Sequence, residues 1–328
     1  MSELAPRRSL TPPPEGEGGL FSQTWFPVCR SDEVLAGVVN GFDFLGGRVI
    51  VVRNASGEAS VLSAYCPHLG ADLCTGEMVG DEVRCPFHYW RYDSGGRCVA
   101  TGSGDPVPAN ARLFAFPTVE RFGCVFAFNG EEPLFDLPGF PDAPRNLIWK
   151  TGEYEVEMPV DPWVICCNTP DMQHIQVVHG ITFDNGLPHD DVEWTDHSMV
   201  YRFSGTSRDG VAVRFHVGIY GTNLYWQDGY FDGRWFGFFA PMGLPRPGSN
   251  RLYFAVGVED DGSDPAAASS FLDAMYALEA AVATEDLPIV ERARFKPGTL
   301  TRSDKTLGRF FQYLRNYPRA HPAAGFIN

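Results

Sequence analysis

The sequence predicts an α+β protein of two domains, and three observations support this prediction. The chain has 328 residues, of which 44% are hydrophobic and 13% aromatic, enough for two packed cores. Its first half contains short runs of β-branched and aromatic residues separated by glycine-rich turns, which are typical of an all-β domain. Its second half contains a long β-rich section with two predicted helices, which favours helices packed on one antiparallel sheet.

The domain boundaries follow from composition. Residues 1–19 are rich in Pro, Gly and Glu and are predicted to form a flexible tail, because they cannot bury a core. A Pro- and Gly-containing linker at 137–144 marks the end of the first domain. We therefore expect a first domain over residues 20–140 and a second domain over residues 141–328.

Strands in the first domain are predicted from alternating apolar runs. One hairpin joins residues 48–53 to 59–62 and leads directly into Cys66. A second hairpin, with a Gly-Gly turn, is expected at 90–99, and residues 123–128 form a further strand.

The second domain is expected to be an antiparallel sheet covered by helices, a helix-grip-like arrangement. Its strands are predicted at 152–158, 199–203, 211–220 and 252–258. One helical stretch is expected around Asp161–Val178, and a second helix from Ala266 to about Arg294. The second helix has apolar residues at a spacing of three, four and seven, typical of one buried face: Phe271, Met275, Leu278, Val282 and Ile289.

Charge and cysteine content limit the possible partners and the compartment. The net charge is −15 and no Lys/Arg run occurs, which argues against nucleic acid or an anionic membrane as partner. No run of about 18 apolar residues predicts a membrane span. The eight cysteines lack the spacing of a disulfide framework, and the N-terminus lacks the apolar region of a signal peptide. We expect a cytoplasmic protein.

The segment from Cys66 to His88 contains the pattern C-x-H, sixteen residues, C-x-x-H. Each half supplies one thiolate and one imidazole, as a Rieske [2Fe–2S] centre requires, with Cys on one iron and His on the other. Cys66 and Cys85 would bind the first iron, and His68 and His88 the second. A zinc site is the alternative, because zinc accepts the same ligands; it would make the chain a colourless zinc-binding interaction protein.

A second group of metal ligands is predicted in the second domain, where Asp171, His174 and His179 form a D-x-x-H-x4-H pattern. Mononuclear non-haem iron sites use two His and one carboxylate and leave other positions open. Residues five apart on a regular helix point about 140° away from each other. Both imidazoles can face one metal only if the helix is bulged or ends there, and Gly180 offers an end.

The third ligand is expected on the C-terminal helix. Glu285 and Asp286 lie on either side of its apolar stripe, so the helix phase does not choose between them. Asp171 follows Pro170 and is also a good helix N-cap.

These motifs resemble those of the Rieske non-haem iron oxygenases, and the resemblance covers nearly everything after residue 20. Its residues are Cys-Pro-Phe-His-x-Trp-Arg from Cys85, the Gly-Gly-Arg-Cys hairpin, Gly-Asp-Pro-Val-Pro, and Glu-Asp-x-x-Ile-Val-Glu from Glu285. Within the family these features look like the single-component-type oxygenases, which include ketosteroid and sterol hydroxylases and O-demethylases. Tyr89 departs from the pattern, because many members have Gly there.

The resemblance also implies roles for individual residues. His174, His179 and Asp286 would bind mononuclear Fe(II). Asp171 would connect His174 to His68 or His88 of an adjacent subunit, which implies a head-to-tail homotrimer.

The expected function is that of a terminal oxygenase. Electrons from NAD(P)H would arrive through a separate ferredoxin and/or flavin reductase, because the chain has neither a G-x-G-x-x-G motif after a strand nor a four-cysteine ferredoxin pattern. With O2, the enzyme would hydroxylate or demethylate a small, largely apolar or polycyclic substrate; desaturation stays open. The aromatic residues of the second domain are expected in its core. The alternative is a Rieske electron carrier without a catalytic iron.

Overall fold

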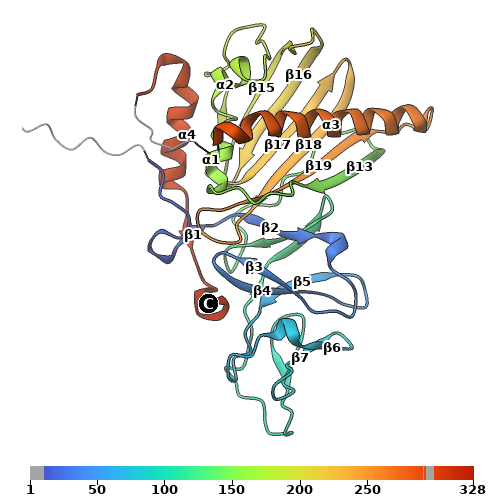
Figure 1. The fold of residues 1–328 in the computed structure, drawn as a ribbon, viewed down its shortest axis with the longest axis vertical. Coiled ribbons are helices and arrows are strands. Elements are labelled where there is room, and N and C mark those ends of the chain that lie inside the picture. Colours follow the sequence, from blue (N-terminus) through green and yellow to red (C-terminus); the bar gives the residue numbers. More distant parts are fainter. Residues whose placement is uncertain (1–10, 291, 293–298) are drawn as a thin grey trace, which may run out of the picture.

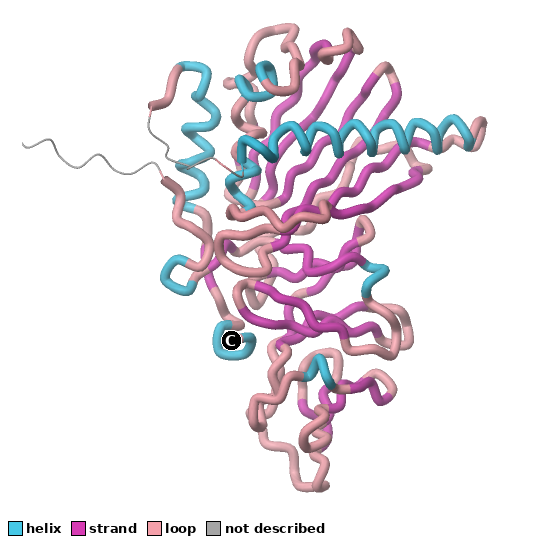
Figure 2. Tube along the Cα trace, viewed as in Figure 1, coloured by secondary structure: helices cyan, strands magenta, loops and turns pink. Residues whose placement is uncertain are grey.

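The computed structural model describes residues 11–290, 292 and 299–328. The molecule consists of a lower part built from small sheets and an upper part built from one large sheet with helices (Figure 1). Figure 2 shows that strands dominate both parts and that the longest helix crosses one face of the large sheet. The predicted fold class, α+β with an all-β N-terminal domain, is confirmed.

The lower part contains a three-stranded sheet of order β11-β12-β2 and two four-stranded sheets of order β10-β5-β4-β3 and β6-β7-β8-β9. Its strands are β2 (Trp25–Arg30), β3 (Asn40–Phe44), β4 (Gly47–Arg53), β5 (Ala59–Ser63), β6 (Glu77–Val79), β7 (Glu82–Arg84), β8 (Arg91–Tyr92), β9 (Cys98–Ala100), β10 (Ala115–Phe116), β11 (Thr118–Arg121) and β12 (Cys124–Phe128). Both predicted hairpins are present, as the antiparallel pairs β4–β5 and β8–β9.

The large sheet is antiparallel throughout, with the strand order β13-β19-β18-β17-β16-β15-β14. Its strands are β13 (Leu147–Glu153), β14 (Glu193–Trp194), β15 (Ser198–Thr206), β16 (Ala212–Tyr220), β17 (Leu224–Phe231), β18 (Arg234–Gly243) and β19 (Arg251–Glu259). The prediction of a strand at 152–158 was misplaced. Leu147–Glu153 pairs residue by residue with β19, whereas Met158 only forms an isolated bridge with Asn250.

Helices α1 (Pro162–Cys166) and α2 (Met172–Val177) replace the single helical stretch predicted around Asp161–Val178, because the chain turns between them. Helix α3 (Pro265–Val290) crosses the sheet, and its predicted end near Arg294 lies outside the described residues. The remaining helices are α4 (Lys305–Asn316), α5 (Ala324–Ile327) and the 3-10 helices Glu17–Gly19, Ser31–Glu33, Leu73–Thr75 and Arg302–Asp304.

The buried face of α3 is rotated from the predicted stripe. Leu272, Met275 and Leu287 are buried against the sheet, whereas Ile289, predicted to be buried, is 53% exposed. Glu279 lies on the buried face, so a purely apolar stripe could not reveal its position.

Part of the predicted flexible tail is packed. Glu15 is buried, and its carboxylate accepts hydrogen bonds from the Ser22 hydroxyl and backbone N–H and lies 3.4 Å from Arg319 Nη2. Its own backbone N–H donates to Asp161 Oδ2 over 2.9 Å. These partners compensate for the burial of a charged group. Nearby, β1 (Phe21–Ser22) pairs with β20 (Arg319–Ala320). Residues 1–10 lie outside the described part.

None of the helices in the described ranges is long and apolar enough to cross a membrane. The eight cysteines are all free.

Candidate metal centres

Two loops of the lower part bring the four predicted cluster ligands together. In the first loop the Cys66 N–H donates to the Ala71 carbonyl, and the Gly70 N–H returns to the Cys66 carbonyl. In the second loop, Cys85 donates to the Trp90 carbonyl and accepts from the Tyr89 N–H. Each cysteine is therefore fixed at the base of a turn closed by a pair of backbone hydrogen bonds.

The thiols and imidazoles of these loops face different environments. Cys66 and Cys85 are buried, and Cys66 Sγ lies 3.0 Å from the hydroxyl of Tyr92. The rings of His68 and His88 are 4.6 Å apart between centroids, and His68, an exposed residue, stacks on Trp90 at 4.4 Å. The two thiols are thus buried, whereas His68 is exposed and His88 half-buried. Sequence reasoning missed Tyr92, because no spacing rule links it to Cys66.

Tyr89, directly after His88, has a backbone φ of +58° and is 57% exposed. Glycine adopts this left-handed conformation more readily than other residues, which agrees with the glycine that the family resemblance expects there. The tyrosine ring is covered on one face by the Arg84 guanidinium, 5.0 Å from its centroid.

The second group of predicted ligands is positioned by the short helix α2. The Asp171 carboxylate caps this helix by accepting a hydrogen bond from the His174 N–H over 3.0 Å. Helix α2 ends at Val177, and Gly180 has a φ of +67°. His174 therefore lies on the helix and His179 beyond its end, as their spacing requires, and their Nε2 atoms are 3.0 Å apart.

Asp286 reaches the same point from α3. Its Oδ1 lies 3.2 Å from His174 Nε2 and 3.5 Å from His179 Nε2, and the three ligand atoms lie within 4.8 Å of one another. The neighbouring Glu285 instead contacts His179 Nδ1 at 3.1 Å and forms an ion pair with Arg208. Of the two carboxylates that the sequence left open, Asp286 faces both Nε2 atoms.

The carboxylates and imidazoles at this site stabilise each other's charged forms. Burial raises the pKa of Asp286, but the two adjacent imidazoles outweigh this effect and hold the pKa well below its usual value. Burial lowers the pKa of His179, but Asp286 and Glu285 outweigh it, so the net pKa is raised. Oδ1 of Asp286 is buried without a hydrogen-bond partner among the described residues. One anionic oxygen and two imidazoles form a donor set that a divalent cation can satisfy.

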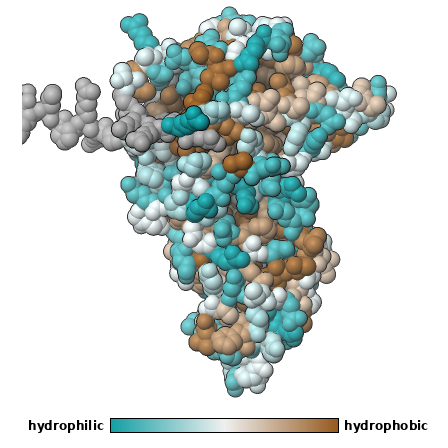
Figure 3. Space-filling model, in the orientation of Figure 1, coloured by the Kyte–Doolittle hydropathy of each residue, from teal (hydrophilic) through white to brown (hydrophobic). Residues whose placement is uncertain are grey.

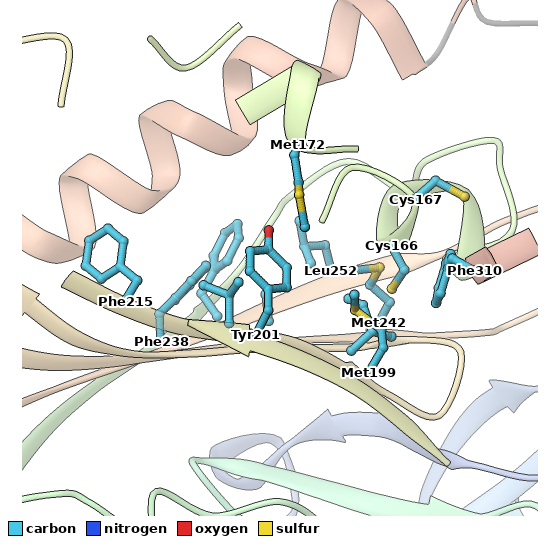
Figure 4. Packing of buried hydrophobic residues seen from close by; sticks show 14 of the residues in the cluster. Cys166, Cys167, Met172, Met199, Tyr201, Phe215, Phe238, Met242, Leu252 and Phe310 are labelled. Atoms are coloured by element: carbon cyan, nitrogen blue, oxygen red, sulfur yellow. The ribbon is translucent and has the colours of Figure 1, made fainter. Parts of the chain in front are cut away.

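A cavity of about 380 Å³ opens beside these three residues, between α3 and the large sheet. Figure 4 shows Tyr201, Phe215 and Phe238 extending from the sheet toward α3, with Met172 approaching from α2. Several of the aromatic residues expected in the core line the cavity, among them Phe203, Phe215, Tyr225 and Phe238. The alternation of side chains along each strand distinguishes them from Trp226, which packs on Phe140 on the other side of the sheet.

Comparison with known proteins identifies the first domain. Residues 24–117 match the family model of the Rieske [2Fe-2S] domain. Over 175 residues the chain is 33% identical to cholesterol 7-desaturase of Bombyx mori. The aligned region covers 52% of this chain and 37% of the relative. It is 30% identical over 166 residues to the oxygenase component of 3-ketosteroid-9-alpha-monooxygenase of Mycobacterium tuberculosis. This alignment covers 48% of this chain and 43% of the relative. The matches span less than half the length of these relatives.

Solved structures match over most of the chain. NdmB of Pseudomonas putida CBB5 has a TM-score of 0.71 at 18% identity, covering 89% of this chain and 90% of that one. Dicamba monooxygenase bound to dicamba has a TM-score of 0.67 at 20% identity, and the match covers 90% of this chain and 97% of that one. At these identities the likeness concerns the fold.

Residues 24–117 thus form a Rieske [2Fe–2S] domain. Over part of its sequence, and in its fold, the chain is similar to Rieske-type oxygenases, the class that its motifs predicted.

Proposed function

We propose that this chain is the terminal oxygenase of a multicomponent system, which uses O2 and electrons from NAD(P)H to hydroxylate or demethylate a largely apolar organic molecule. The observation that carries the proposal is the convergence of His174, His179 and Asp286 at the wall of an apolar cavity. Such a three-residue set leaves coordination positions open for dioxygen next to a bound substrate.

The residues present fit both metal groups. Asp286 Oδ1, buried and lacking a hydrogen bond within the described chain, would gain a partner in Fe(II). Two buried thiols, with two imidazoles close to each other and nearer the surface, fit a Rieske cluster held by Cys66, Cys85, His68 and His88. When bound, the cluster supplies single electrons and the mononuclear iron supplies the site of dioxygen activation.

Neighbouring side chains would orient these ligands. Asn168 Nδ2 donates to Asp286 Oδ2 over 2.9 Å, which leaves Oδ1 directed at the imidazoles. Glu285 contacts His179 Nδ1 and would fix the orientation and tautomer of that ring. Arg208 holds Glu285 in turn and also donates to the Val178 carbonyl. The mainly apolar lining of the cavity would limit contact between water and a bound substrate.

We propose further that the chain works as a head-to-tail homotrimer. Figure 1 places β6 and β7, beside the cluster loops, at the end of the molecule remote from α2. Electron transfer would therefore run between subunits, with Asp171 connecting His174 to His68 or His88 of a neighbour. The exposed Leu69, Phe87 and Tyr89 surround those histidines and offer apolar contact area to the neighbour or to a ferredoxin or flavin reductase. Figure 3 shows apolar surface at this lower end.

The substrate class is proposed from the cavity and the relatives. The lining is dominated by Phe, Val, Leu and Ile side chains, and the volume falls in the usual range for small-molecule sites. Two relatives are named for cholesterol and for a 3-ketosteroid. A polycyclic molecule fits these observations, and the eight free cysteines agree with a cytoplasmic location.

Iron and acid-labile sulfide, measured on protein purified without oxygen, test the proposal. We expect about three irons and two sulfides per chain, and about two irons with the same sulfide in His179→Ala. Two irons in the wild type, unchanged by added ferrous iron, would indicate an electron carrier. Zinc without sulfide would indicate a structural metal site.

A further inference from the structure

Three of the polar side chains that line the mainly apolar cavity form a chain of hydrogen bonds. The Tyr225 hydroxyl donates to Gln227 Oε1 over 2.5 Å, and Gln227 Nε2 donates to Glu279 Oε1 over 3.4 Å. Tyr225 and Gln227 are two positions apart on β17 and thus on one face of the sheet, while Glu279 comes from α3. All three line the cavity.

The carboxyl group of Glu279 is buried among apolar side chains, and this changes its protonation. Glu279 is only 9% exposed, and Val217 and Phe238 flank Gln227 on the adjacent strands. Burial raises the pKa of Glu279 to about 8, so the carboxyl group is protonated at neutral pH. Its second oxygen has no hydrogen-bond partner among the described residues. The bonds run from Tyr225 through Gln227 to Glu279, which leaves the Glu279 hydroxyl as a donor toward the cavity.

Helix α3 sets the distance between this group and the proposed iron site. Glu279 and Asp286 are seven residues apart on the same helix. Seven residues are close to two turns, so the two carboxyl groups lie on one face with a separation of about 10 Å along the axis. The cavity therefore has a metal site and a hydrogen-bond donor at two separate points of an apolar wall.

We propose that Glu279 determines substrate specificity by donating a hydrogen bond to a ketone or hydroxyl oxygen of a largely apolar substrate, about 10 Å from the carbon that is oxidised. The inference rests on the proposed oxygenase function and adds the position of one polar group on the substrate. A neutral oxygen fits better than an amine, because an amine would bury an ion pair in this cavity. Gln227 and Tyr225 act as positioning residues for the carboxyl group.

Binding, measured without turnover, tests the inference. Isothermal titration calorimetry of the anaerobic, unreduced holoenzyme would compare 4-cyclohexylcyclohexanone with bicyclohexyl, which lacks the oxygen. We expect the wild type to bind the ketone about tenfold more tightly, the effect of one buried hydrogen bond. Glu279→Met should bind both compounds equally. Glu279→Gln should keep most of the preference for the ketone through its amide N–H, whereas Gln227→Met should weaken this preference. Asp273→Asn, on the exposed side of α3, is the matched control and should equal the wild type.

Several results would overturn the inference: equal binding of both compounds by the wild type, binding of neither, tighter binding of 4-cyclohexylcyclohexylamine, or an undiminished preference in Glu279→Met. If Glu279→Met did not fold, the comparison of Glu279→Gln and Gln227→Met with the wild type would decide the question. The proposed oxygenase function fails separately, because a missing mononuclear iron, or no oxidation of the ketone by the reduced enzyme, leaves the binding preference unaffected.

Discussion

Asn168 and Asp286 are joined by a hydrogen bond of 2.9 Å, although 118 residues separate them in the sequence. The bond connects the end of α1 to α3 and fixes the carboxylate whose other oxygen faces both imidazoles. We expect Asn168→Ala to weaken Fe(II) binding roughly 10- to 100-fold, the usual effect of removing such an orienting partner. A ferrous iron titration of the iron-depleted protein would measure this. Asn185→Ala, at an exposed position, should bind iron normally; equal affinities in both variants would contradict the orienting role.

The choice between Glu285 and Asp286 can be tested directly. Asp286→Ala should reduce the iron content from about three to about two per chain, because it removes a proposed ligand of the mononuclear iron but leaves the ligands proposed for the cluster. Glu285→Gln should retain about three, since its carboxylate contacts the His179 ring from the Nδ1 side. Iron and sulfide analysis of both variants would measure the contents. The reverse pattern would show that Glu285 is the ligand.

Asp171 has two roles that different substitutions separate. Its carboxylate caps α2, and Asn is an equally good N-cap, so Asp171→Asn should leave the thermal unfolding midpoint unchanged. Asp171→Ala should cost about 1 kcal/mol of stability. If Asp171 also connects subunits, the Asn variant should slow oxidation of the reduced cluster roughly 10- to 100-fold in stopped-flow absorbance. Normal cluster oxidation in Asp171→Asn would leave only the capping role.

Gly102 packs directly against the backbone of His88 in the second cluster loop. A Cβ atom at this position would lie 2.1 Å from the His88 carbonyl oxygen, so the backbone that bears the ligand would have to move. We expect Gly102→Ala to cost about 1–3 kcal/mol and to lower the visible absorbance of the cluster per chain. Gly139→Ala has space for its methyl group and serves as the control. A full cluster in Gly102→Ala would mean that the loop tolerates the shift.

The raised pKa of Glu279 makes stability depend on pH. Because the pKa rises from 4.5 to about 8 on folding, the folded protein binds more protons than the unfolded chain between these values. Stability should therefore fall as pH increases from about 4.5 to 8. Glu279→Gln removes this contribution, so its unfolding midpoint should fall less steeply than that of the wild type across the same range. His179, whose charge lowers the pKa of Glu279, is common to both proteins. Parallel curves would show that Glu279 is ionised in the folded state.

Local motifs could be predicted from the sequence because their residues lie close together in the chain. The cluster loops and the D-x-x-H-x4-H segment need only turns and one helix end, and the backbone hydrogen bonds around Cys66 and Cys85 form within a few residues. The end of α2 before His179 is one of the two possibilities, a bulge or a helix end, that helix geometry allows for two histidines facing one metal.

Features that depend on distant segments could not be predicted in this way. Glu15 is buried because Asp161 and Arg319 come to it from other parts of the chain. The position of β13 depends on its register with β19. Helix phase did not choose between Asp286 and Glu285; the family resemblance chose Asp286, and the packing of α3 over the sheet turns it to the imidazoles. Glu279 was missed for the same reason, since a carboxylate on a long helix is usually exposed.

Helix α3 carries both Glu279 and Asp286, so in the proposed function its helical repeat would set the distance between the bound substrate oxygen and the carbon that is oxidised. The carbon presented to oxidation would be set by the helical repeat and not by a flexible loop. The periodicity of a single helix would thus offer a means of choosing which carbon of a rigid molecule is modified.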